Sequence, residues 1–410
     1  MNTTPTPPLP LDLAHPEVRA NPYPVYRWYR EHSPVHRVEP TQADGVPRYF
    51  VSRWSDVEAG LKNPILKRSI HPNSLWNQPL ENVPPALRTY ARVTREWPIY
   101  RDAPQHAPAR RPVNRVLQDA SAIELSVILD GTLDDLRSLK AFDAAEVFAR
   151  RVALQLNLEM LGLEKHSWLE LGSHLHDLSL GFGNVYDAQR LAKASHAMET
   201  LERWINEAAQ SKRTRPALFL DRLLALQEAG RIAGPAQLAA TAILFVQAGQ
   251  DTTSALIANG ILTLLKHPRH IARLIAEPDF APQVVEEVLR FESPVQQTIW
   301  HASEPLEIRG VPVEKGNGVT FLLGAANRDP EMFESPEEFD PTVQRSRTAA
   351  FGFGPHACPG ADFGRQTAAA SLRAFFQKFP HATLVNATPT WKPLAIFRSV
   401  TELFVRPAGN

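Results

Sequence analysis

The segment FGFGPHACPG, Phe351–Gly360, contains the only cysteine of the chain, Cys358, framed by three glycines. Glycine adopts a positive φ without the penalty of a Cβ and lets the backbone approach another group closely. The segment therefore predicts a loop folded around a flat or bulky group, with the cysteine sulfur presented to it. A lone cysteine is more often a small buried hydrophobe, but the glycines around Cys358 favour a ligand.

A thiolate in this loop would need a metal that brings its other ligands with it. Zinc and iron–sulfur sites require several thiolate or imidazole ligands, and the chain has no second cysteine. Haem supplies its own nitrogen ligands and accepts an axial sulfur, so haem is the candidate. A helix is predicted over 361–379, directly after the loop, and the dipole at its N-terminus would stabilise a thiolate.

The composition is that of a globular protein. Of the 410 residues, 43% are hydrophobic and 21% are charged, which excludes the disordered and fibrous classes. The 44 basic and 44 acidic residues cancel, so no global charge favours nucleic acid or an anionic membrane as partner. One cysteine fits a reducing compartment, and the start of the chain has neither a signal-peptide nor an anchor pattern. We expect a soluble, cytoplasmic protein.

Hydrophobic periodicity predicts a mainly α fold with small β-sheets, as a single domain over 1–410. After an N-terminal extension over 1–18, the patterns predict β-rich parts over 35–53 and 298–320. The proline-containing stretch 71–100 predicts a long irregular segment. Helical periodicity dominates elsewhere, at 23–30, 55–61, 107–117, 123–139, 144–161, 166–180, 195–210, 218–228 and 282–290.

The longest predicted helix, 235–267, is apolar except for the cluster AGQDTT at 248–253 in its middle. The polar residues leave no apolar run of about twenty residues, the length that a membrane span needs. A glycine and adjacent threonines lower helix propensity, and such a violation in a central helix predicts function. The alternative is that Asp251 and the threonines only hydrogen-bond to the backbone and bend the helix.

Taken in order, these motifs resemble those of the cytochrome P450 superfamily, in particular its soluble bacterial type. The cysteine loop is the most specific of them, and the others gain weight from their order along the chain. The resemblance implies a large helical domain, a smaller β-rich region, and a haem between the central helix and the cysteine loop. It covers nearly the whole chain, through PYPVYRWYREHSPVHRV near the start, HAPAR at 106–110, AGQDTT at 248–253, EEVLR at 286–290, ANRDPEMFESPEEFDP at 326–341 and FGFGPHACPG at 351–360.

The resemblance implies that Cys358 is the thiolate ligand of a b-type haem iron. His106 and Arg110 lie one helical turn apart, on one face, and Arg can hold a carboxylate through two parallel hydrogen bonds. By the resemblance they and His356 bind the haem propionates. The implied cofactor-binding residues are thus Cys358, His106, Arg110, His356, Phe351, Gly352 and Trp300.

Trp300 is a departure from the family pattern, because it stands where a further propionate-binding arginine is usual. An indole N–H donates one hydrogen bond and no charge, so the haem anchoring would differ here, with His301 as a possible substitute. A second departure concerns the family's structural brace, Glu287 and Arg290. The segment 336–339 lacks the arginine often found there, which predicts a simpler brace.

Asp251 and Thr252 match the family's acid–alcohol pair. A carboxylate exchanges protons with solvent and a neighbouring hydroxyl donates to oxygen or holds a water, so the pair would deliver protons during dioxygen reduction. Gly249 would leave space for dioxygen and substrate. We also expect substrate-pocket walls from Trp97, Phe182, Leu244, Phe245, Ala248, Val295, Gln296, Ile396 and Phe397.

The implied enzyme is a haem-thiolate monooxygenase that takes two electrons from a separate ferredoxin and reductase. It would hydroxylate or epoxidise a small organic substrate in bacterial secondary metabolism or catabolism. We expect a monomer without nucleic-acid or membrane partners, and a ferredoxin-docking face with Arg110, Arg111, Arg115 and Arg365. Desaturation, ring coupling or nitration on the same fold is the first alternative. A haem protein that binds a ligand without turnover is the second.

Overall fold

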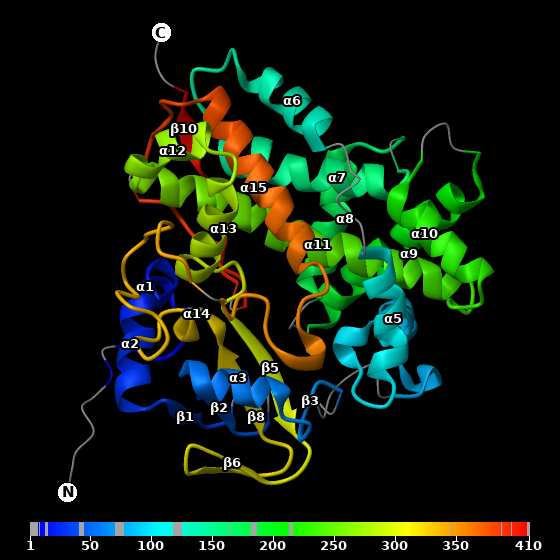
Figure 1. Ribbon diagram of the computed structural model, residues 1–410. Helices are drawn as coiled ribbons and strands as arrows, with labels where there is room; N and C mark the ends of the chain where they lie inside the picture. The colour runs from blue at the N-terminus through cyan, green and yellow to red at the C-terminus, as the bar shows by residue number, and fades with distance from the viewer. Residues whose placement is uncertain are drawn as a thin grey trace, which may run out of the picture. The chain divides into compact units, whose positions relative to one another are not determined.

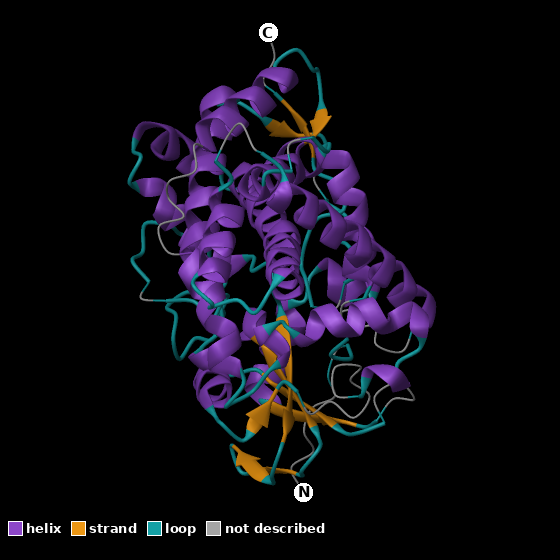
Figure 2. Ribbon diagram, turned by 90° about the vertical axis from the view of Figure 1, so that its right-hand side faces the viewer, coloured by secondary structure: helices purple, strands orange, loops and turns teal. Residues whose placement is uncertain are grey.

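The computed structural model describes residues 7, 9–12, 15–40, 45–69, 78–117, 125–163, 165–181, 187–212, 216–345, 347–386, 388–394 and 396–407. Helices dominate the described chain and the strands form small sheets (Figure 2), which confirms the predicted fold class. The chain divides into two compact units. The first unit comprises Met1–Lys67, Leu129–Arg150 and Thr252–Asn410, and the second Arg68–Ile128 and Arg151–Asp251.

The main sheet of the first unit has five strands in the order β1-β2-β8-β5-β3 (Figure 1). Strand β2 pairs with β8 in parallel, with Tyr49 opposite Val319, and the other pairs are antiparallel. Both predicted β-rich segments therefore meet in one sheet. The strands are β1 (Val35–Val38), β2 (Arg48–Val51), β3 (Leu66–Lys67), β5 (Gln297–Ala302) and β8 (Gly318–Leu322).

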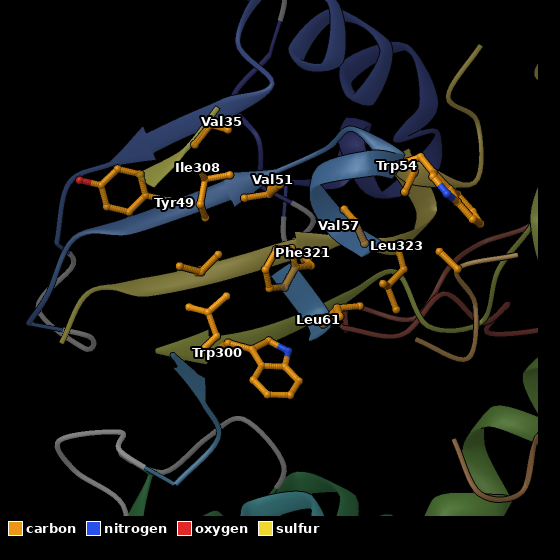
Figure 3. Packing of buried hydrophobic residues seen from close by; sticks show 14 of the residues in the cluster. Val35, Tyr49, Val51, Trp54, Val57, Leu61, Trp300, Ile308, Phe321 and Leu323 are labelled. Atoms are coloured by element: carbon orange, nitrogen blue, oxygen red, sulfur yellow. The ribbon is translucent and has the colours of Figure 1, made fainter. Parts of the chain in front are cut away.

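Helix α3 (Trp54–Lys62) covers this sheet with one apolar face (Figure 3). Trp54, Val57 and Leu61 are spaced so that they lie on one side of a helix, and all three are buried against the sheet. A Cβ on Gly60 would lie 2.2 Å from the Phe321 ring. The glycine thus allows the helix backbone to approach β8, and the core of the first unit forms there.

Helix α15 (Ala361–Lys378), which follows the cysteine loop, packs on α13 (Phe280–Phe291) in the first unit (Figure 1). Its Phe375 contacts the rings of Phe142 and Phe148. The remaining elements are α1 (Pro16–Ala20), α2 (Tyr23–His32), β4 (Phe142–Asp143), the π-helical η6 (Ala145–Arg150), η7 (Pro268–His270), α12 (Ile271–Ala276), β6 (Leu306–Ile308), β7 (Val311–Val313), α14 (Leu323–Ala326), η8 (Gly354–His356), β9 (Thr383–Leu384) and β10 (Phe404–Arg406).

The second unit is helical. Helix α8 (Trp168–Leu180) begins with a capping box, in which Ser167 and Glu170 satisfy each other's backbone N–H groups. It packs on α9 (Ala188–Gln210). The other elements of this unit are η2 (Leu80–Asn82), η3 (Pro85–Leu87), α4 (Arg88–Arg95), η4 (Pro98–Tyr100), α5 (His106–Leu117), α7 (Arg151–Leu161) and α10 (Leu218–Glu228). Helix α6 (Leu125–Leu136) contains the boundary between the units.

The prediction of an irregular segment over 71–100 is wrong in its second half, where α4 forms; residues 71–77 lie outside the described residues. Tyr90 and Val93 on α4 are buried, and Arg92 makes two hydrogen bonds to the Glu202 carboxylate on α9. These tertiary contacts stabilise a helix whose β-branched and arginine-rich sequence gave no clear helical pattern. The prolines nearby lie in the short 3-10 turns.

Helix α11 (Pro235–Lys266) confirms the long predicted helix. The chain passes from the second unit to the first between Asp251 and Thr252, inside this helix. On its second half, a Cβ at Gly260 would lie 2.8 Å from a methyl carbon of Leu372 on α15, so the glycine permits close helix packing.

Among the described helices, none has the length and apolar character needed to cross a membrane.

Candidate active site

The cysteine loop is closed by its own backbone. The Cys358 N–H donates to the Phe351 carbonyl at 2.8 Å, and the Ala357 N–H donates to the Gly354 carbonyl at 3.1 Å. Gly352 and Gly354 have φ angles of +67° and +71°, which L side chains rarely adopt. A Cβ on Gly354 would also lie 2.7 Å from the Leu61 carbonyl oxygen at the end of α3. Gly354 therefore fixes the loop against α3, a contact that the sequence did not predict.

The thiol lies beside a helix N-terminus and is exposed. Helix α15 begins at Ala361, and Cys358 Sγ lies 4.0 Å from the position of a Cβ on Gly360. The positive end of the helix dipole favours a thiolate there. Among the described residues, no group of three or more His, Cys, Asp or Glu side chains could hold a metal by itself. A lone thiolate of this kind fits a metal carried by a macrocycle, and so fits haem.

His356 and Trp300 lie together in the first unit. The two rings meet edge to face, with centroids 5.0 Å apart and planes at 90°. Trp300 lies on β5, belongs to the core beside the sheet (Figure 3), and is 5% exposed. The indole in place of an arginine thus packs against the neighbouring imidazole. His301, the substitute considered above, is buried on the same strand.

His106 and Arg110 lie one turn apart on α5 in the second unit. Burial lowers the pKa of His106, and the nearby Arg110 cation lowers it further, against an opposing effect of Asp102. The imidazole is therefore held mainly neutral at pH 7. Arg110 donates from Nε to the side-chain oxygen of Asn114 at 2.9 Å. This hydrogen bond orients the guanidinium along α5.

The polar middle of α11 is fixed by α8. Ser179 Oγ donates to Asp251 Oδ2 at 2.7 Å, and Gln247 Nε2 donates to Ser179 Oγ at 2.8 Å. Ala248 is exposed although its helix is largely buried, and a Cβ at Gly249 would meet only Asn157 Oδ1, at 3.9 Å. This part of α11 can therefore border a bound group. Thr252, the alcohol of the predicted pair, is half-buried.

The brace around Glu287 has a second arginine, so the expectation of a simpler brace is corrected. Arg290 donates from Nε and Nη2 to the two oxygens of Glu287 at 2.8 and 2.7 Å. Arg345 Nε lies 3.0 Å from Glu287 Oε2. The prediction considered only 336–339, whereas the arginine comes from the coil that follows. The carboxylate compensates two buried cations, so its removal would leave them unpaired beside the segment that leads to the cysteine loop.

The predicted pocket residues fall into two groups. In the first unit, Val295 forms a β-bridge with Phe397, and the Gln296 N–H donates to the Ile396 carbonyl. The Gln296 amide is engaged inside the core, where it accepts from Tyr26 and donates to the Ser293 carbonyl.

In the second unit, Leu244 and Phe245 are half-buried on α11, near the exposed Ala248. Trp97 is fully buried and donates from its indole N–H to the Ala240 carbonyl of α11 at 2.9 Å. Phe182 lies outside the described residues. The pocket assignments remain predictions.

The structure thus brings Cys358, Phe351, Gly352, His356 and Trp300 together in the first unit, and pairs Phe351 with Arg365, whose guanidinium carbon lies 4.5 Å from the ring centroid. The sequence did not predict Ser179, Gln247 or Arg345. Gln247 precedes Asp251 by four residues, and this helical spacing could have indicated a neighbour. No sequence signal indicated Ser179.

The chain is similar to known proteins over most of its length. The cytochrome P450 family model matches residues 149–395. The biotin biosynthesis cytochrome P450 of Bacillus subtilis is 27% identical, over 95% of this chain and 97% of the relative. The vitamin D(3) 25-hydroxylase of Pseudonocardia autotrophica is 30% identical, over 89% and 88%. The crystal structure of CalO2 superposes with a TM-score of 0.84 at 28% identity, covering 97% of this chain and 99% of that one.

The chain belongs to the cytochrome P450 family, of the bacterial type. It is a haem-thiolate monooxygenase, an enzyme that uses dioxygen, electrons from redox partners and an organic substrate. Haem supplies the oxygen-activating iron in this class.

Proposed function

We propose that Cys358 is the axial ligand of haem b, and that His106, Arg110 and His356 bind its propionates. Trp300 completes the set by packing on His356 at 5.0 Å. The observation that supports this assignment best is the exposed thiol in a loop that its own backbone closes beside a helix N-terminus. We propose that residues 1–410 form a single P450 domain, since the family's relatives match nearly the full length.

The proposed reaction is the hydroxylation or epoxidation of a small organic substrate. Asp251 and Thr252 deliver protons while dioxygen is reduced, and Gly249 leaves room for the reacting molecules. The proposed pocket is mostly apolar, which favours a substrate with a hydrocarbon body. The electrons come from a separate ferredoxin and its reductase, since membership of the family implies redox partners. The protein is a cytoplasmic monomer that acts in secondary metabolism or catabolism.

The first experiment combines a carbon monoxide difference spectrum with dioxygen consumption. A thiolate-type spectrum together with substrate-dependent dioxygen consumption is the expected result. A thiolate-type spectrum without any consumption would identify the non-turnover alternative instead. A screen of small molecules for a low-to-high-spin shift identifies compounds that displace the water on the iron, and product analysis then separates hydroxylation from desaturation, ring coupling or nitration.

Thr252→Ala tests the proton-delivery assignment. We expect haem binding and the spin shift to stay unchanged, since the hydroxyl is not a haem ligand. The fraction of electrons that ends in hydrogen peroxide should rise several-fold, because general acid catalysis of this kind contributes roughly 10²–10⁴-fold. Peroxide formed per electron consumed is the measurement, and normal coupling in the variant would remove Thr252 from the mechanism.

A further inference from the structure

Two buried glutamines lie on neighbouring turns of α11, and only one of them is connected to the proposed acid. Gln247 and Gln250 are 6% and 2% exposed. Gln247 donates to Ser179, which in turn donates to Asp251. Within the described part of the chain, neither amide atom of Gln250 has a hydrogen-bond partner. The same side chain thus occurs twice in one helix, once inside a hydrogen-bond chain and once outside it.

The chemistry of the three side chains fixes the direction of the hydrogen bonds that link Gln247, Ser179 and Asp251. An amide nitrogen only donates, so Ser179 Oγ accepts from Gln247 Nε2. The single proton of the Ser179 hydroxyl is then directed to Asp251 Oδ2, 2.7 Å away. The serine could otherwise rotate and donate elsewhere, because hydroxyl protons turn to suit their surroundings. Gln247 therefore makes Ser179 a donor to Asp251, and Asp251 an acceptor with a fixed orientation.

The hydrogen bond of Gln247 has a structural cost. Its Oε1 is buried without a partner among the described residues, and an unsatisfied buried acceptor costs about 1–3 kcal/mol. An apolar side chain of similar size would avoid that cost in a helix that is otherwise largely apolar. Gln250 carries a cost of the same kind, with two such atoms. Gln247 differs from it by the hydrogen bond to Ser179, and this bond links it to Asp251.

We propose that Gln247 and Ser179 are positioning residues for proton delivery by Asp251. They hold one carboxylate oxygen and thereby fix the orientation of the Asp251 carboxylate. The proposal rests on the proposed function of Asp251. It concerns side chains of α8 and α11, and it assigns no catalytic role to either positioning residue, since neither Gln247 nor Ser179 gives up a proton in the reaction.

The test compares matched variants. Gln247→Leu removes the donor to Ser179, Ser179→Ala removes the hydroxyl, Ser179→Thr restores it, and Gln250→Leu serves as the control of equal size on the same helix. All are made in the full-length holoprotein. A carbon monoxide difference spectrum of the thiolate type in each variant confirms that the haem site is intact before other measurements are compared.

The first readout is the infrared band of the Asp251 carboxylate in protein labelled with carbon-13 aspartate, assigned by its loss in Asp251→Asn. We expect the band to shift in Ser179→Ala and in Gln247→Leu, and to stay in place in Gln250→Leu and Ser179→Thr. The shift in the double variant of Ser179→Ala with Gln247→Leu should equal that of Ser179→Ala alone, because Gln247 acts through Ser179.

The second readout is the solvent deuterium isotope effect on dioxygen consumption with ferredoxin and reductase. The compound with the largest spin shift in the screen serves as the probe. Gln247→Leu and Ser179→Ala should increase the isotope effect at least two-fold, and Gln250→Leu should leave it unchanged. Equal behaviour of Gln247→Leu and Gln250→Leu in both readouts would overturn the proposal. If Asp251→Asn itself leaves the isotope effect unchanged, the proposed function of Asp251 fails, whatever the infrared band shows.

Discussion

The cysteine loop and the middle of α11 are built in different ways. The loop is shaped by its backbone, through the bond from Cys358 N–H to the Phe351 carbonyl and two glycines with positive φ. The middle of α11 is a regular helix, and its Asp251 side chain is oriented by a residue of another helix, Ser179, 72 residues earlier in the chain. A site made by local backbone conformation depends mainly on the residues of its own segment. A site made by side-chain contacts depends on a partner that can be exchanged.

The largest expected effect lies in the loop and leaves its backbone intact. Cys358→Ala removes the sulfur but none of the backbone hydrogen bonds, so the fold should be retained while the axial ligand is lost. We expect the thiolate-type carbon monoxide spectrum and dioxygen consumption to disappear. Far-ultraviolet circular dichroism should be unchanged. Persistence of the thiolate-type spectrum would contradict the assignment of Cys358.

The next largest effect concerns the brace around Glu287. Like the middle of α11, it depends on side-chain contacts. Glu287→Gln leaves Arg290 and Arg345 buried without their carboxylate, and breaking a buried ion pair costs about 3–5 kcal/mol. Denaturant unfolding should show a loss of that size. Arg27→Met is the matched control, because the pair of Arg27 with Glu337 is largely exposed and surface pairs contribute about 0–1 kcal/mol. Equal losses in the two variants would refute the special role of the buried pair.

Gly354→Ala then tests whether the loop depends on its backbone. The new Cβ would meet the Leu61 carbonyl oxygen at 2.7 Å, at a φ of +71°, and we expect a loss of about 2–3 kcal/mol in the free energy of unfolding. Gly310→Ala is the control, since Gly310 has a φ of +76° and nothing within 4 Å of the new Cβ. The control should lose about 1–2 kcal/mol, the cost of the left-handed conformation for an L residue. The difference between the two variants in the free energy of unfolding measures the contact with α3. Equal losses would mean that the positive φ alone causes the destabilisation.

The smallest effect is the pH dependence of stability near the brace. Burial, and then the neighbouring Arg269, lower the pKa of His270 from its ordinary value near 6.5. The unfolded chain therefore binds a proton at higher pH than the folded chain, so stability falls as the pH drops below about 6.5. His270→Gln should reduce this fall, because a side chain without a titrating proton no longer contributes to it. Unfolding at pH 7 and pH 5 measures it, and an unchanged fall would mean that other groups cause it.

Local features were predicted well from the sequence. The strand Val35–Val38 and the helix Leu218–Glu228 have the predicted bounds, because apolar residues recur there with the period of their element. The turn of the cysteine loop was also predicted from local sequence, since Gly352 and Gly354 allow a positive φ wherever the loop lies. The helix start at Ala188 was placed seven residues too late, although Asp187 caps it.

The features that the sequence did not predict depend on tertiary partners. Helix α4 forms because Arg92 reaches Glu202 on α9, and Arg345 joins Glu287 across 58 residues of chain. The bond from Ser179 to Asp251 is of the same kind. A serine in the last turn of a helix has no property that distinguishes it from a surface serine, until the fold places a carboxylate beside it.

The passage of α11 from one unit to the other between Asp251 and Thr252 has a consequence for how the enzyme could diversify. The Asp251 carboxylate takes its orientation from Ser179 on α8 in the second unit. Thr252 belongs to the first unit, which contains the cysteine loop. Selection for a new substrate would cause substitutions to accumulate on α8. These substitutions would change the orientation of the Asp251 carboxylate and leave the cysteine loop unchanged. Under the proposed roles of Asp251 and Cys358, descendants of this chain would differ in how efficiently they couple electrons to product while keeping the same absorption spectrum.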